Sequence, residues 1–178
     1  IVSPGTNFDF LDSKEENFLT SLMVDINRGI YSIAYSAIDV TTGKTYLLES
    51  HSTSSDKSYA LDEAFNLLTT HKTKEVVLSA AVPEVDLNEV IRYLELDTHY
   101  KYVINKSRFK LSYQNRLFKE VYRIESMLSP IEFLDLERNM LLSENLAILV
   151  DFIVGHDSNI VQKLAYPKKL ASQRFLYF

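Results

Sequence analysis

The chain has 178 residues, 46% hydrophobic and 24% charged, so it is long enough to bury a core and too apolar to be mainly disordered. The absence of cysteine excludes disulfides, thiolate chemistry and cysteine-based zinc sites. A net charge of −5 argues against nonspecific nucleic-acid binding, and we expect the one basic run, Lys101 to Lys119, to be a solvated edge and helix face.

The N-terminal part contains three runs rich in β-branched and aromatic residues. We expect Ile1 to Asp12, which shows no period, to be an extended arm. Short turn signals with Gly29 and Gly43 separate the three runs, and in the second turn we expect Gly43 to take a positive φ and Asp39 to accept backbone hydrogen bonds. The pattern predicts an antiparallel three-strand meander over Leu22 to Ile26, Ile30 to Val40 and Thr45 to Leu48.

The middle run of this meander has two different faces, because successive side chains of a strand point to opposite sides. One face is aromatic and large, and the other is small. Since small side chains let a helix come close to a sheet, we expect a helix on the second face. The first face carries Tyr31, Ile33, Tyr35 and Ala37, and the second carries Ser32, Ala34, Ser36 and Ile38.

Alternating helices and strands follow the meander. The polar stretch Ser50 to Ser58 predicts a loop whose end caps a helix from about Asp56 to His71. The apolar run Glu75 to Ala81 predicts a buried strand. Asp86 is the expected cap of a second helix, and Tyr100 to Ile104 predicts a further strand, so this strand, helix, strand order indicates a parallel crossover.

Helical periods dominate the remaining sequence. A third helix is predicted from Ser112 to Ile124, with Tyr113, Leu117, Val121 and Ile124 inward. After Pro130 the pattern predicts a short turn, a long helix over Met140 to Val154 ended by Gly155, a brief helix over Asp157 to Leu164, and an extended piece from Lys169 to Phe178. The fold class is therefore α/β and RNase H-like, with a three-strand antiparallel meander, two parallel strands with crossover helices, and a C-terminal helical segment.

The candidate residues for catalysis and metal binding are few. An RNase H-like nuclease holds two divalent metals with converging carboxylates, and Asp25 stands at a suitable place in the first strand. The fourth strand ends in Leu78 to Ala81 without an acid before Glu84, and the third helix offers only Glu120 and Glu125. We therefore interpret Asp25 as a residue that shapes the turn, and we expect no catalytic site, metal or cofactor in this chain.

The four histidines, at positions 51, 71, 99 and 156, stand singly at the ends of predicted elements. None has a second ligand three or four residues away on a helix, the spacing of a helical metal site. Two of them, His71 and His156, are placed near helix C-termini, where the helix dipole favours a partly positive side chain.

A set of short motifs suggests a family. Ser3-Pro4-Gly5-Thr6, then Asn17-Phe18-Leu19 before the first strand, and Ile38 to Gly43 in the meander together resemble the connector domain, domain II, of DNA mismatch repair MutS proteins. The resemblance continues through the helical segment after Pro130 and into Pro167 to Phe178, which is similar to the entry into the lever domain. It covers nearly the whole chain.

The resemblance implies a domain division and a function. Residues 1–16 would be a linker from the mismatch-binding domain, 17–127 the connector, 128–165 a helical segment leading to the lever, and 166–178 the start of the core and lever domain. The fragment would be a non-enzymatic module that links these parts, relays conformational change and offers a docking surface for MutL. Mismatch recognition, DNA binding and ATP hydrolysis would belong to other domains of the parent protein.

The same resemblance implies a location for the partner. The family's MutL contact involves the sheet edge and the start of the helix after the last strand, which matches Gln114 and Asn115 here. An ordinary solvated first helical turn is the alternative interpretation of these two amides.

Two other functions stay open at this point, a divergent metal-dependent RNase H-like nuclease and a protein-interaction domain unrelated to repair.

No apolar run approaches the roughly 20 residues that span a bilayer, and the N-terminus lacks a signal-peptide pattern. We therefore expect an intracellular fragment of a longer protein.

Overall fold

A six-stranded mixed sheet forms the centre of the protein, of which the computed structural model describes residues 17–172. The strand order is β5-β4-β1-β2-β3-β6, with β1 to β3 antiparallel, β4 and β5 parallel to β1, and β6 parallel to β3. This order is that of the RNase H-like fold, so the predicted fold class is confirmed. The strands are β1 Phe18–Asn27, β2 Ile30–Asp39, β3 Thr45–His51, β4 Glu75–Ala80, β5 Tyr100–Val103 and β6 Lys168–Lys169.

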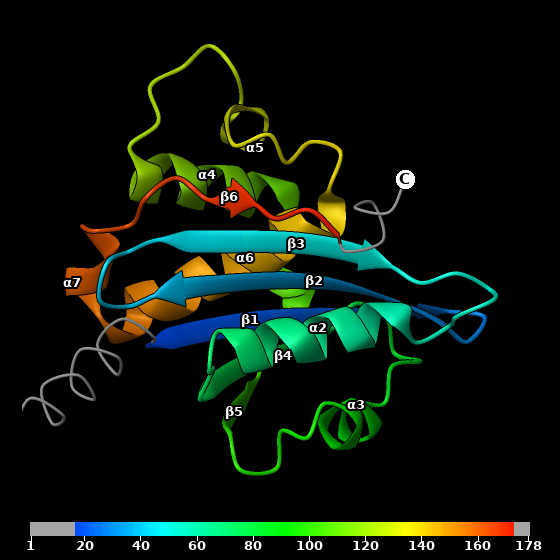
Figure 1. Cartoon of the computed structure of the whole chain (residues 1–178). Coiled ribbons are helices and arrows are strands. Elements are labelled where there is room, and N and C mark those ends of the chain that lie inside the picture. The colour runs from blue at the N-terminus through cyan, green and yellow to red at the C-terminus, as the bar shows by residue number, and fades with distance from the viewer. Residues whose placement is uncertain (1–16, 173–178) are drawn as a thin grey trace, which may run out of the picture.

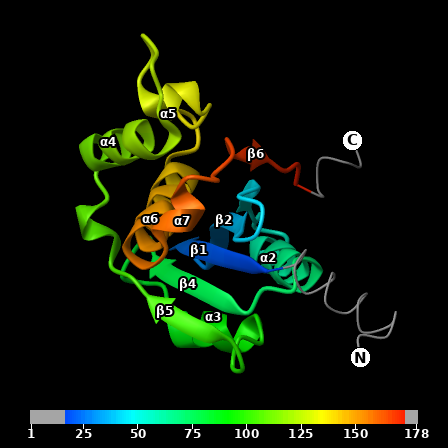
Figure 2. The same cartoon turned by 90° about the vertical axis from the view of Figure 1, so that its left-hand side faces the viewer.

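Helices cover both faces of the sheet (Figures 1 and 2). One face packs against α6, Met140–His156, and the other against α2, Tyr59–Thr70, and α3, Leu87–Tyr93. The remaining helices are η1 Lys106–Arg108, α4 Leu111–Tyr122, α5 Pro130–Phe133 and α7 Ser158–Val161. Within residues 17–172 no helix combines the length and the apolar character that crossing a bilayer requires.

The two faces of β2 divide the core as the sequence predicted. Ala34 and Ile38 belong to the cluster that contains α6, whereas Ile33 and Tyr35 belong to the cluster that contains α2 and α3. The close approach of α6 therefore depends on the small side chains of one face. The aromatic face is filled by Tyr35, which is fully buried.

A buried amide, that of Asn145, joins α6 to the two central strands. Its Oδ1 accepts a hydrogen bond from Ser21 Oγ at 2.7 Å, and its Nδ2 donates to the backbone oxygens of Ser21 and Ala34 at 2.9 and 3.0 Å and to Ser36 Oγ at 3.0 Å. Asn145 is fully buried. Because every polar atom of this side chain has a partner, the amide lies in the core without the cost of an unsatisfied group.

Glu49 of β3 takes over the role of a helix cap for α6. The N-cap residue of α6, Asn139, makes no side-chain capping hydrogen bond. Instead Glu49 Oε1 accepts from the Leu142 N–H at 3.0 Å, and Glu49 Oε2 accepts from His51 Nε2 at 2.9 Å and from Asn139 Nδ2 at 3.4 Å. A carboxylate at this end of a helix also interacts favourably with the helix dipole.

Several predicted boundaries were wrong by a few residues. β1 begins at Phe18 rather than Leu22, since Phe18 pairs with Asp39 across the sheet. α6 continues through Gly155 to His156, and Asp157 starts α7 by accepting a hydrogen bond from the Asn159 N–H.

The start of α2 also differs from the prediction. Ser58 stands at its N-cap but makes no capping bond with its side chain, and Ser52 Oγ accepts from the Ala60 N–H at 2.8 Å instead. The predicted cap Asp86 of α3 is confirmed, because its side chain accepts from the N–H groups of Asn88 and Glu89.

The helical segment after residue 127 shares one hydrophobic core with the sheet, since Leu146 and Leu149 of α6 cluster with Met23 of β1. The predicted division at residue 128 therefore does not correspond to a break in packing among the described residues. The next predicted unit, 166–178, is described only to residue 172, where β6 pairs with β3. The predicted linker, 1–16, lies outside the described residues, as does 173–178.

Gly43, in the turn between β2 and β3, allows the segment that follows α7 to pass close to this turn. Its φ is +82°, as expected, and a Cβ at this position would lie 2.0 Å from the backbone oxygen of Lys163. The Ala165 N–H donates to the Gly43 oxygen at 3.0 Å, and Asp39 Oδ1 accepts from the Thr41 N–H at 2.9 Å. No larger residue fits this crossing without moving the backbone.

The Glu49 cap predicts a specific dependence of stability on pH. Burial of the carboxylate by itself raises its pKa, but the hydrogen bonds from His51, the Leu142 N–H and Asn139 outweigh burial, and the pKa of Glu49 lies below its usual value. A lowered folded-state pKa contributes stability that is present above the unfolded pKa and is lost as the pH falls through the folded pKa.

We therefore expect Glu49→Gln to lower the free energy of unfolding at pH 7 by about 1 kcal/mol, and the difference from wild type to shrink between about pH 5 and pH 3. Urea unfolding across this pH range measures the difference in the free energy of unfolding. The control is Glu137→Gln, which changes an exposed glutamate. A difference that is the same at pH 7 and pH 3 would contradict the assigned role of Glu49.

Candidate functional site

Small residues stand beside Asp25, where an RNase H-like nuclease needs further carboxylates that converge on the metals. Asp25 lies near the end of β1, partly exposed, and pairs with Ser32 of β2. On its other side the chain leaves β4 through Ala80 and Ala81, and the Ala81 N–H donates to the oxygen of Val24 at 2.8 Å. No group of three His, Cys, Asp or Glu side chains suited to a metal occurs within residues 17–172.

A hollow of about 490 Å³ lies beside these residues, at the carboxyl ends of β4 and β5. Its lining is mainly apolar, with Ala80, Pro83, Leu87 and Val103 among its residues, and no acidic residue lines it. The one cation there, Lys106, is paired with Glu144 at 3.5 Å. The hollow therefore has the shape of a site at this end of the sheet but not the ligands that divalent metals prefer.

Gln114, expected from the resemblance as a partner contact, is 2% exposed. Its Nε2 donates to the backbone oxygen of Phe109 at 2.8 Å, and its Oε1 accepts from Ser143 Oγ of α6 at 2.5 Å. The side chain therefore joins α4 to α6 and does not reach the surface. The predicted inward face of α4 was also wrong in part. Gln114 and Phe118 are buried, whereas Tyr113 and Val121 are only partly buried.

Asn115, the second expected contact, is partly buried and holds α5 in place. Its Oδ1 accepts from the Ile131 N–H at 3.0 Å, one of the first N–H groups of α5, which have no partner within the helix. The two neighbouring amides therefore connect α4 to α6 and to α5, respectively. Both amides therefore make contacts within the fold, although Leu111 and Ser112 of the same helical turn are exposed.

Other side chains form the surface near the start of α4. Arg108 pairs with Asp151 of α6, with 2.5 Å between Nη2 and Oδ2, and the Tyr113 hydroxyl donates to the other oxygen of Asp151. This hydrogen bond is the main cause that raises the pKa of Tyr113, followed by burial and by the charge of Asp151. The guanidinium of Arg108 also lies 4.7 Å from the ring centre of Phe109, and that of Arg116 lies 5.1 Å from the ring centre of Tyr113.

A second hollow, of about 500 Å³, adjoins this group between β5, η1 and α6. An aromatic row lines it, in which Phe152 lies 4.9 Å from Tyr102 and stacks on His156 at 4.0 Å between ring centres. The adjacent edge strand β5 has two well exposed side chains, Tyr100 at 70% and Val103 at 64%. We call the surface formed by β5, η1, the first turn of α4 and this hollow the β5 edge surface.

Part of the β5 edge surface is predictable from the sequence. Arg108 belongs to the basic run singled out from the sequence, whereas Phe152 and His156 were not recognised as a pair. The predicted helix ends at Val154 and so leaves out His156. In the structure α6 continues to His156, four residues after Phe152, and this spacing places both rings on the same side of the helix.

Comparisons with known proteins agree in part with the resemblance. No family model matches the chain. A putative DNA mismatch repair protein, a mutS homologue of Acanthamoeba polyphaga mimivirus, is 27% identical over 198 residues, an alignment that covers 94% of this chain and 18% of that protein. The chain thus spans less than a fifth of this relative, and the similarity supports a relationship to the MutS family.

Two solved structures are similar in fold. T. thermophilus RuvC in complex with a Holliday junction substrate has a TM-score of 0.43 and 9% identity, with 80% of this chain and 97% of that chain covered. The human cytomegalovirus terminase nuclease domain has a TM-score of 0.42 and 11% identity, with 82% and 86% covered. Both TM-scores are below 0.5, so the fold assignment depends on the strand order described above.

The burial of Gln114 predicts a cost when its amide is removed. We expect Gln114→Ala to lower the free energy of unfolding by about 2 kcal/mol, because the Phe109 oxygen and the Ser143 hydroxyl lose their partner in a buried place. Urea unfolding measures this loss. The matched control is Gln162→Ala, which changes an exposed glutamine, and an equal effect of the two substitutions would contradict the joining role of Gln114.

Proposed function

We propose that this chain is a non-catalytic connector module of a MutS-type DNA mismatch repair protein, which joins neighbouring domains of its parent and offers a docking surface to a MutL-type protein. The observation that carries this proposal is the similarity to the viral mutS homologue along 94% of the chain. In this proposal mismatch recognition and ATP hydrolysis belong to other parts of the parent protein.

The local chemistry around Asp25 supports the non-catalytic part of the proposal. Two-metal phosphodiester hydrolysis needs several carboxylates that bracket the reacting oxygens. The strand next to Asp25 ends in Ala80 and is followed by Ala81, and the lining of the neighbouring hollow includes no acid. The alternative, a divergent nuclease, requires a divalent metal near Asp25, which a metal titration followed by NMR of this residue would detect.

The β5 edge surface is the proposed contact for the MutL-type protein. The resemblance places such a contact at the sheet edge and at the start of the helix after the last strand, which corresponds to β5 and α4. Since Gln114 is buried there, the contact would involve the exposed side chains of Tyr100, Val103 and Leu111. Exposed apolar side chains beside a hollow are typical of partner surfaces.

The test is calorimetric titration of the chain with the ATPase domain of a cognate MutL-type protein. We expect saturable binding that the double variant Val103→Asp/Leu111→Asp weakens at least tenfold, about 1.4 kcal/mol, because charged groups replace apolar contacts. These two positions are preferable to Gln114, whose replacement would disturb the core.

The matched control is Leu128→Asp, since Leu128 in the α4–α5 loop is 51% exposed and Leu111 is 49% exposed. Leu128 follows the other end of a helix of 12 residues, roughly 18 Å long, and its substitution should leave affinity within about twofold. Absence of saturable binding, or equal losses in both variants, would overturn the docking proposal.

A further inference from the structure

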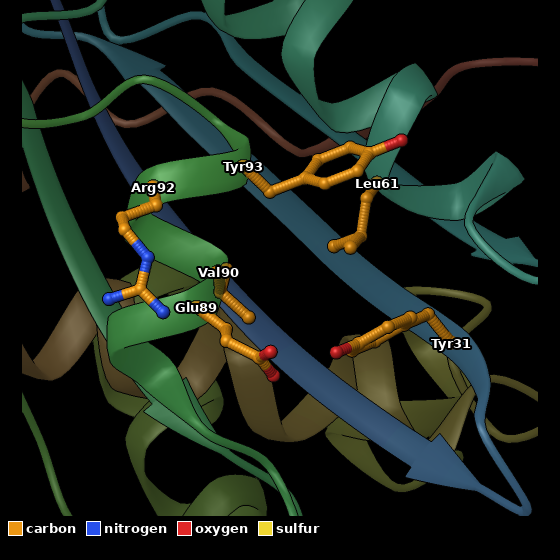
Figure 3. Close-up of a pocket in the computed structure, with 6 residues that line it drawn as sticks. All are labelled: Tyr31, Leu61, Glu89, Val90, Arg92 and Tyr93. Carbon is orange, nitrogen blue, oxygen red and sulfur yellow. The ribbon is translucent and has the colours of Figure 1, made fainter.

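A third hollow lies on the opposite face of the sheet from α6, between α2, α3 and the start of β2 (Figure 3). Its volume is about 370 Å³. The floor is apolar, because Leu61 and Val90 are each only 1% exposed. The rings of Tyr31 and Tyr93 lie on either side of Leu61 in Figure 3 and form the walls.

The ring of Tyr93 is held in position although it is 46% exposed. Its hydroxyl donates to Asp62 Oδ1 of α2 at 2.6 Å, so a hydrogen bond between the two helices fixes one wall of the hollow. A ring fixed in this way loses little conformational freedom when a ligand stacks on it.

One carboxylate, that of Glu89, lines the hollow, and further acidic residues lie near its two tyrosines. Figure 3 shows the Glu89 carboxylate directed toward the Tyr31 hydroxyl. Arg92 also lines the hollow, and its guanidinium lies on the side of α3 away from the two tyrosine rings. Burial raises the pKa of Tyr31 first, and the negative charges of Glu89 and Asp86 raise it further.

Acidic residues also raise the pKa of the second tyrosine, Tyr93. The hydrogen bond to Asp62 is the largest cause that raises the pKa of Tyr93, and the charges of Asp62 and Asp56 add to it. A further cation, Lys57, lies against Gly29 in the β1–β2 turn. Acidic residues thus stand near both tyrosines, Glu89 and Asp86 near Tyr31 and Asp62 and Asp56 near Tyr93.

We propose that this hollow binds an arginine side chain presented by a partner polypeptide. The apolar floor suits the aliphatic stem, the two tyrosine faces suit a planar guanidinium, and Glu89 offers a carboxylate for paired hydrogen bonds. A phosphate or another anion is disfavoured by the same carboxylates. The site lies away from the β5 edge surface and does not depend on the proposed connector function.

The experiment is an NMR titration of the ¹⁵N-labelled full chain with the blocked pentapeptide acetyl-Gly-Ser-Arg-Ser-Gly-amide. The same peptide with citrulline in place of arginine keeps the shape and removes the charge. We expect saturable shifts of Tyr31, Glu89 and Tyr93 with a Kd of about 1 mM, and at least fivefold weaker binding of the citrulline peptide.

Three variants locate the interaction. Glu89→Gln and Tyr93→Leu should each weaken binding about threefold or more, since they remove the carboxylate and one ring. The matched control Glu95→Gln makes the same change at an exposed glutamate just after α3 that does not line the hollow, and it should bind the peptide with about the wild-type affinity. Circular dichroism verifies that each variant is folded.

The proposal is overturned if the arginine peptide causes no saturable shift up to 10 mM, about ten times the expected Kd. It is also overturned if the citrulline peptide binds equally, or if Glu89→Gln binds with the wild-type affinity.

Discussion

The buried amide of Asn145 is the interaction on which the arrangement of the C-terminal half depends. It connects α6 to β1 and β2 through four hydrogen bonds, and it can do so because Ala34 and Ser36 leave room on that face of β2. Glu49 then holds the first turn of α6 from β3. With α6 fixed at two points, Ser143 positions Gln114 of α4, and the next residue of α4, Asn115, positions α5.

The sequence predicted the frame of this structure well where the signal is local. The two faces of β2, the turn at Gly43 and the Asp86 cap each follow from a few neighbouring residues, and each was confirmed. The buried side-chain hydrogen bonds between elements could not be predicted from the sequence, because they connect residues far apart in the chain. Ser21 and Asn145, for example, are separated by 124 positions. The position of Gln114 in its helix does not show from the sequence alone that the side chain is buried. Its burial becomes clear only from the hydrogen bond with Ser143 of α6.

The sheet differs from that of a nuclease in a way that is compatible with the proposed function. An RNase H-like sheet brings β1 and β4 side by side, which is the geometry that metal-binding carboxylates need. Here β4 ends in Ala80, which Ala81 follows, and the buried hydrogen bonds of Asn145 connect the sheet to α6. A sheet and a helical segment joined so closely would act as a stiff link between other domains, with the β5 edge surface left open for a partner.

The central claim is that the sheet and the helical segment after residue 127 form one cooperative unit, and native-state hydrogen exchange tests it most directly. We expect the amides of Leu146, Ala147 and Ile148 in α6 to exchange with the same free energy as those of Met23 in β1 and Ile33 in β2, within about 1 kcal/mol, because both groups open only in global unfolding. Exchange of the α6 amides at a free energy several kcal/mol lower, roughly 3 or more, would show a separate and weakly attached segment. That result would contradict the account of a single stiff link.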